Sequence, residues 1–120
     1  MSTIVSYKDL EVWQYGKKLA VSIYKETGNF PDSEIYGLVN QMRRAAISIP
    51  SNIAEGFRRK TDKEKAQFAR IAYGSGAELE TQAEIAFELG YLSSLQYKEI
   101  IENLTSIMKM LNKLISILEK

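Results

Sequence analysis

Apolar residues recur at steps of three and four along four stretches of the chain, the spacing of one face of an α-helix. The stretches cover residues 9–27, 33–59, 62–89 and 94–119. We find no stretch that alternates apolar and polar residues with the period of two typical of a half-buried strand. Four long helices with short connections predict an all-α fold, an up-down-up-down antiparallel four-helix bundle that forms a single domain over residues 1–120.

Capping signals set the helix boundaries. Residues 32–33 are Asp and Ser, both good N-cap types. Residues 61–64 and 93–96 fit the capping box, in which a hydroxyl and an acidic or amide side chain satisfy backbone N–H groups reciprocally. Gly90 follows the third apolar stripe and predicts its C-terminus.

The second stretch contains a proline in its interior. Pro50 lacks an N–H, and its ring meets the carbonyl of Ala46, which favours a kink. The apolar stripe nevertheless keeps its phase from Ile49 through Ile53 to Phe57. Continuous phase favours one helix kinked at Pro50 over two helices separated by a loop.

The last two stretches predict how the bundle packs. The third stretch offers small residues that would let a neighbouring helix approach its backbone: Ala69, Ala72, Gly74, Gly76, Ala83 and Ala86. The fourth stretch repeats apolar residues as a heptad seam: Tyr97, Ile101, Leu104, Met108, Leu111, Ile115 and Leu118.

The fourth stretch is also apolar over a wider arc than one buried face requires. Residues outside the seam extend this arc to roughly 200°, against roughly 100° for a helix with a single buried stripe. A monomer would leave the excess exposed. We therefore expect a homo-oligomer with its interface on these residues: Ile100, Ile107, Met110, Leu114 and Ile117.

Composition excludes most catalytic chemistry. The 120 residues contain no histidine and no cysteine, so the commonest general base and the usual transition-metal ligands are missing. A di-metal bundle site would need converging carboxylates, whereas Glu78, Glu80, Glu84 and Glu88 spread around their helix. We predict a protein that is not an enzyme and that holds no metal and no cofactor.

The same composition bears on location. A chain without cysteine fits a reducing compartment, the first thirty residues lack a signal-peptide pattern, and no apolar run approaches the roughly 20 residues that span a bilayer. We expect a cytoplasmic protein with no membrane association.

Charge is segregated although the net charge is only +1. Residues 41–70 carry eight Lys or Arg against three Asp or Glu, and residues 71–102 carry six Glu against one Lys. Either the two segments attract each other as neighbouring helices, or the basic one binds a partner. The candidate residues for contacting RNA or DNA backbone are Arg43, Arg44, Arg58, Arg59, Lys60, Lys63, Lys65 and Arg70.

Two alternatives qualify this patch. Arg58, Arg59 and Lys60 follow a helix C-terminus, where the dipole stabilises cations in any case. If the patch binds nucleic acid, we expect electrostatic binding with little sequence specificity, because Phe57 and Tyr73 are the only aromatic residues near it in sequence. Without nucleic acid, the chain would serve as a protein-interaction scaffold.

A set of polar residues recurs where the second and third helices would face each other: Ser48, Asn52, Glu55, Gln82 and Glu84. They form either a pocket opened by the kink or a polar seam that satisfies freed carbonyl groups. We favour the seam.

Several strings resemble one family. They are YKDLEVWQ from Tyr7, FP…EIYGLVNQMRRAAISIPSNIAEG from Phe30 to Gly56, GSGAELETQ from Gly74, and ELGYL from Glu88. They are similar to the four-helix-bundle proteins encoded in intervening sequences of large-subunit ribosomal RNA genes, related to the accessory variability determinant proteins of diversity-generating retroelements. The resemblance implies an antiparallel bundle and a ring-shaped homo-oligomer, a pentamer. It also implies relatives that bind nucleic acid and a protein partner, a reverse transcriptase, through a basic surface.

Overall fold

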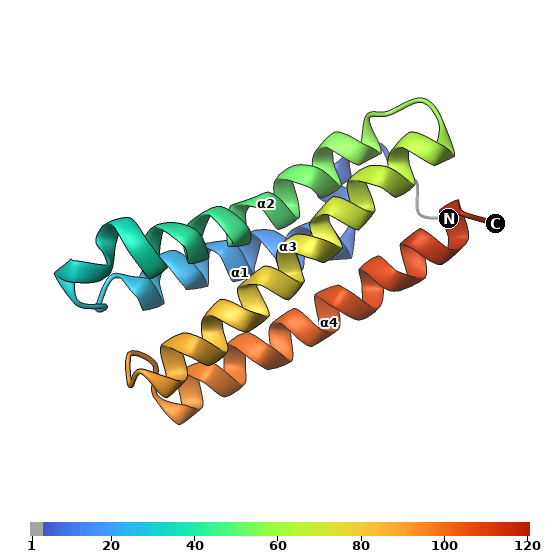
Figure 1. Ribbon diagram of the computed structural model, residues 1–120. Coiled ribbons are helices and arrows are strands. Elements are labelled where there is room, and N and C mark those ends of the chain that lie inside the picture. The colour runs from blue at the N-terminus through green and yellow to red at the C-terminus, as the bar shows by residue number, and fades with distance from the viewer. Residues whose placement is uncertain (1–3) are drawn as a thin grey trace.

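The computed structural model describes residues 4–120, which form four α-helices (Figure 1). The helices are α1 (Glu11–Thr27), α2 (Asn40–Phe57), α3 (Asp62–Glu88) and α4 (Ser94–Leu118). Each helix packs against the next along the chain, and α4 returns to pack against α1. The predicted antiparallel bundle is confirmed, and it places the α2–α3 pair and the α1–α4 pair on opposite sides of the molecule.

The start of the second helix differs from the prediction. A 3₁₀ turn (Asp32–Glu34) leads into a π-helical turn (Ile35–Val39), and the backbone at Gly37 departs from helical geometry. The capping side chain is Glu34, whose carboxylate accepts a hydrogen bond from the N–H of Leu38 at 3.3 Å. The carboxylate reaches this N–H because the turn is wider than an α-helical turn, a feature that residue types alone do not reveal.

The helix through Pro50 is continuous, as the unbroken apolar stripe predicts. On the neighbouring helix, Gly16 lies directly opposite. A Cβ atom at Gly16 would come within 3.4 Å of Ile49 and 3.6 Å of Pro50. The glycine therefore lets α1 approach α2 where the proline ring occupies the interface.

A single core runs along the bundle axis. Its largest fully buried side chains are Leu19, Ile23, Met42, Ile49, Leu79, Ile100, Leu104, Ile107 and Leu111. Small residues of α3 face this core, and Gly76 meets α4 most closely, since a Cβ there would collide with Sδ of Met108. Gly74, predicted to pack in the same way, instead lies exposed with nothing within 4 Å of an added Cβ.

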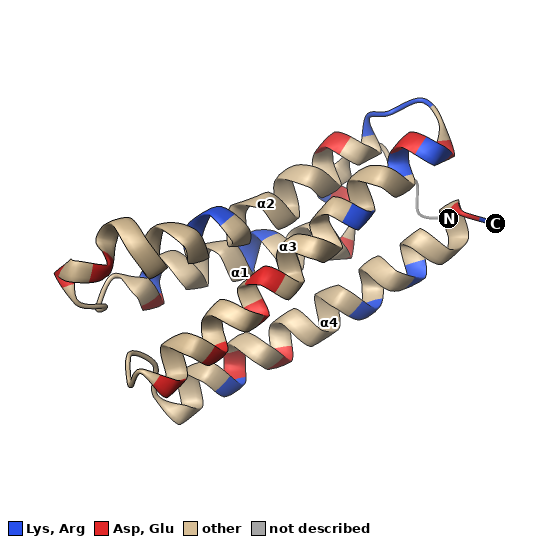
Figure 2. Ribbon diagram, viewed as in Figure 1, with Lys and Arg blue, Asp and Glu red and all other residues tan. Residues whose placement is uncertain are grey.

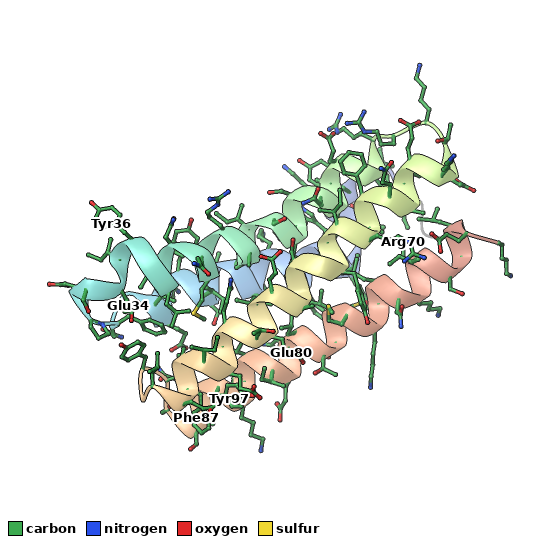
Figure 3. The ribbon with its side chains drawn as sticks, in the orientation of Figure 1. Glu34, Tyr36, Arg70, Glu80, Phe87 and Tyr97 are labelled. Atoms are coloured by element: carbon green, nitrogen blue, oxygen red, sulfur yellow. The ribbon has the colours of Figure 1, made fainter. Side chains whose placement is uncertain are left out.

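The α3–α4 joint follows its sequence signals. Gly90 has φ +81°, and the N–H of Tyr91 donates to the carbonyl of Ala86 at 2.9 Å, the bond that closes a left-handed helix end. The capping box of Ser93 and Gln96 is present with both of its bonds. Beside the joint, the rings of Phe87 and Tyr97 stack with centroids 4.6 Å apart (Figure 3).

Candidate nucleic-acid interface

The structure divides the eight candidate basic residues among different surroundings. Five of them gather where α2 ends and α3 begins, at one end of the bundle (Figure 2): Arg58, Arg59, Lys60, Lys63 and Lys65. We call these five residues the basic end. Arg44 lies farther along α2, in a cleft between α2 and α3. Arg43 and Arg70 are held by other parts of the chain.

Arg43 closes the end of α1. Its Nε donates to Oγ1 of Thr27 at 2.9 Å and its Nη2 donates to the carbonyl of Tyr24 at 3.1 Å. Its guanidinium also lies 4.6 Å from the centroid of the Tyr24 ring. Thr27 is buried, so these bonds satisfy the last turn of α1. Arg43 therefore has a structural role and does not join the basic end.

Arg70 is paired with the C-terminal end of α4. Its Nε and Nη2 donate to the two carboxylate oxygens of Glu119 at 2.7 and 2.5 Å, a bidentate ion pair (Figure 3). These hydrogen bonds, aided by the charge of the partner, raise the pKa of Arg70 and lower the pKa of the Glu119 carboxyl. No local pattern predicts this pairing, because the two residues are 49 positions apart.

At the basic end, two guanidinium groups lie over aromatic rings. Arg58 is 5.6 Å from the ring centroid of Tyr7, and Arg59 is 4.7 Å from that of Phe68. Arg59 also forms a salt bridge with Glu55 at 3.5 Å. The aromatic neighbours are thus Tyr7 and Phe68 rather than Phe57 and Tyr73. Tyr7 lies there because the up-down topology brings the start of α1 to the end of α2.

The first turn of α3 follows its prediction only in part. The hydroxyl of Thr61 accepts the N–H of Glu64 at 3.1 Å, as expected. The Glu64 carboxylate does not reach back to the backbone N–H; it accepts the Thr61 hydroxyl at 2.9 Å instead. Glu64 therefore lies beside the basic end and offsets part of its charge.

Three cations of the basic end have no acidic partner within the described chain. Arg58, Lys60 and Lys63 are exposed, and among residues 4–120 they form no salt bridge. Farther along α3, four glutamates are all exposed: Glu78, Glu80, Glu84 and Glu88. Figure 2 shows these glutamates toward the opposite end of the bundle. The charge separation in the sequence has become a separation along the long axis of the molecule.

The structure corrects the predicted interface on α4. Ile100 and Ile107 are only 2% and 0% exposed, because α4 packs against both α3 and α1 and buries two sides of its surface. The core stripe is accordingly Ile100, Leu104, Ile107, Leu111 and Ile115. Of the five interface candidates, Met110 and Leu114 are half-buried and only Ile117 is well exposed, at 56%.

The polar residues between α2 and α3 form a seam, as expected for three of them. Asn52 Nδ2 donates to Oγ of Ser48 at 2.9 Å, and Oγ of Ser75 donates to the same atom at 2.8 Å. Gln82 is buried in this seam. Glu55 and Glu84 point out to solvent instead.

Two further properties of residues 4–120 bear on function. Their side chains include no group of three or more metal-ligating residues placed to hold a metal ion. Within the same range, none of the helices is long and apolar enough to cross a membrane.

Comparison with known proteins assigns the family. The family model of the 23S rRNA-intervening sequence protein matches residues 8–113. A crystal structure of a protein of unknown function from the S23 ribosomal protein family of Bacteroides thetaiotaomicron superposes with a TM-score of 0.77 at 27% identity, covering 91% of this chain and 99% of that one. No curated protein matches the sequence. The chain belongs to the family of 23S rRNA-intervening sequence proteins.

Proposed function

We propose that this protein is a non-enzymatic homo-oligomer, a pentamer in line with its resemblance to the accessory variability determinant proteins, and that it binds RNA or DNA backbone through its basic end. The observation that carries the nucleic-acid proposal is the group of exposed cations without salt bridges, Arg58, Lys60 and Lys63, at one end of the bundle in the described range 4–120.

Phosphate contacts fit this surface better than base contacts. Three flexible cations supply charge without a rigid set of hydrogen bonds, so binding would be salt-dependent and nearly independent of sequence. One such group is a weak site, particularly with Asp62 and Glu64 beside it. An oligomer would repeat the group once per subunit, and simultaneous contacts would raise the overall affinity.

Fluorescence anisotropy with mixed-sequence single-stranded RNA and duplex DNA at low salt tests the proposal. The triple variant Arg58→Glu, Lys60→Glu, Lys63→Glu should lose binding. A control variant, Lys18→Glu, Lys25→Glu, Lys98→Glu, changes the net charge equally at exposed residues elsewhere and should retain most of it. Equal losses in the two variants, or no binding by the wild type, would refute the proposal.

A protein-interaction scaffold is the second candidate. It is favoured by the exposed glutamates of α3, which give the molecule an acidic end of opposite charge to its basic end. A basic end could then meet the acidic end of a neighbour or of another protein. Recovery of one stoichiometric protein and no nucleic acid in a pull-down would support this function against the first.

A further inference from the structure

A cleft of about 470 Å³ lies between α2 and α3, on the side of the bundle opposite the α1–α4 pair. Arg44 and Ser48 line it from α2, and Ser75, Glu78 and Gln82 line it from α3. Arg44 and Glu78 form no salt bridge with each other or with any other residue in the range 4–120. The cleft therefore offers one cation and one anion, which suits a protein surface better than a phosphate backbone.

The floor of this cleft contains a polar group without a partner. Gln82 is only 9% exposed, and its Oε1 has no hydrogen bond within the described chain. A buried, unsatisfied oxygen of this kind is unfavourable, because it has left water without gaining a protein donor. Native structures keep few such atoms, so this one points to a surface whose surroundings are incomplete in the single chain.

The rims of the same cleft are apolar. Ile71 and Ile85 lie on one line along α3, two heptad steps apart, and are 46% and 45% exposed; Ile47 on α2 is 43% exposed. Between the two isoleucines of α3, Gly74 leaves open space where a side chain would stand. Exposed isoleucines beside a bare stretch of backbone form a groove that a helix can enter closely. We refer to the cleft with these rims as the α2–α3 groove.

The opposite side of the bundle carries a ridge of complementary character. Its residues Met110, Leu114 and Ile117 follow Asn103 and Ser106 of α4, which line the groove toward α1. Ile117 is 56% exposed. Lys113, one turn before Ile117, is exposed and gives this α4 ridge a positive charge, opposite to that of Glu78.

We propose that the α2–α3 groove of one subunit receives the α4 ridge of a second copy of this chain. The inference rests on the proposed homo-oligomer and names its contact surfaces. Joining two different surfaces produces a heterologous interface, which repeats from subunit to subunit and closes into a ring when the rotation allows. It also covers the exposed isoleucines and brings polar groups of the neighbour to the edge of the cleft that contains Gln82.

A complementation experiment tests this arrangement. Ile71→Glu disables the groove and Ile117→Glu disables the ridge, while Val21→Glu places the same charge on the exposed side of α1 as a control. Light scattering after size-exclusion chromatography gives the mass of each. We expect the wild type and Val21→Glu to assemble and each of the other two variants alone to be monomeric. Mixed together, the two variants should form a 1:1 dimer through the one intact groove and the one intact ridge.

The outcomes separate the two proposals. A monomeric wild type overturns the homo-oligomer and this inference with it. A wild type that assembles while Ile71→Glu or Ile117→Glu still assembles overturns only the choice of surfaces. Monomeric variants that remain monomeric when mixed also overturn the inference, because the groove and the ridge would then not bind each other. Circular dichroism melting of each variant establishes that all of them are folded.

Discussion

Gly76 and Gly74 lie two residues apart on α3 and should respond oppositely to alanine. In a helix interior, replacing glycine by alanine gains about 1 kcal/mol of intrinsic helix stability. At Gly74 nothing lies within 4 Å of the added Cβ, so the gain should be realised. At Gly76 the Cβ would collide with Sδ of Met108 and lie 3.2 Å from its Cε.

The cost of this collision sets the magnitude. Inserting a methyl group into a packed interface costs about 1–3 kcal/mol. After the gain in helix propensity is subtracted, Gly76→Ala should be destabilised by up to about 2 kcal/mol. Since both variants share the helix gain, the difference between them measures the packing cost alone. For a chain of this length, 1 kcal/mol corresponds to a change in Tm of roughly 3–5 °C.

Met108→Ala provides the internal check. It removes both the sulfur and the terminal methyl group, and the next atom, Cδ1 of Leu104, lies at an ordinary contact distance of 3.6 Å. In that background Gly76→Ala should become stabilising by about 1 kcal/mol, a reversal of sign. Urea unfolding followed by circular dichroism measures all of these differences. A single protein concentration must be used, because self-association would raise the apparent stability.

Two results would contradict the close approach of α3 and α4 at Gly76. One is that Gly76→Ala stabilises the wild type as much as Gly74→Ala does. The other is that Met108→Ala leaves the effect of Gly76→Ala unchanged. Either result would mean that α3 and α4 are farther apart than the structure places them.

Three further changes test other parts of the bundle. Gly90→Ala should cost about 1–2 kcal/mol in urea unfolding, because an alanine resists the left-handed φ of +81° although its Cβ has free space. Ser93→Ala should cost about 1 kcal/mol by the same measurement, since it removes the cap of α4; an unchanged midpoint would refute the cap. Glu119→Gln should lower Tm slightly near neutral pH. The pKa of Glu119 is lowered in the folded state, so its contribution is present above the unfolded value and is lost as pH falls; below about pH 4 the variant and wild type should converge.

The sequence predicts the four helices because each carries an unbroken apolar stripe, and the joint at Gly90 because capping chemistry is local. It does not predict the irregular turn around Gly37, where the backbone depends on how a glutamate carboxylate is placed. The wide apolar arc of α4 is present, but it does not mark an interface along its whole width. In this bundle α4 is covered by two neighbours, so Ile100 and Ile107 belong to the core.

The candidate basic surface shows the same limit. Nearness in sequence groups eight cations, but a helix turns its residues in all directions. Arg43 faces α1 and Arg70 faces the end of α4, and both bind acceptors far away in the chain. Those long-range pairs leave no trace in local patterns. The residues at the α2–α3 joint stay together because a tight connection holds them at one end of the bundle.

The separation of charge along the bundle has a consequence for assembly. In any ring with cyclic symmetry, every copy has the same orientation relative to the axis, so all basic ends lie at one height. These ends repel one another, and added salt screens the repulsion within a Debye length of about 10 Å at 0.1 M. Salt should therefore strengthen the ring while it weakens attachment to phosphate. Binding and assembly would have opposite ionic-strength dependences, and a nucleic-acid strand lying along the basic rim would itself act as the counter-ion that holds the subunits together.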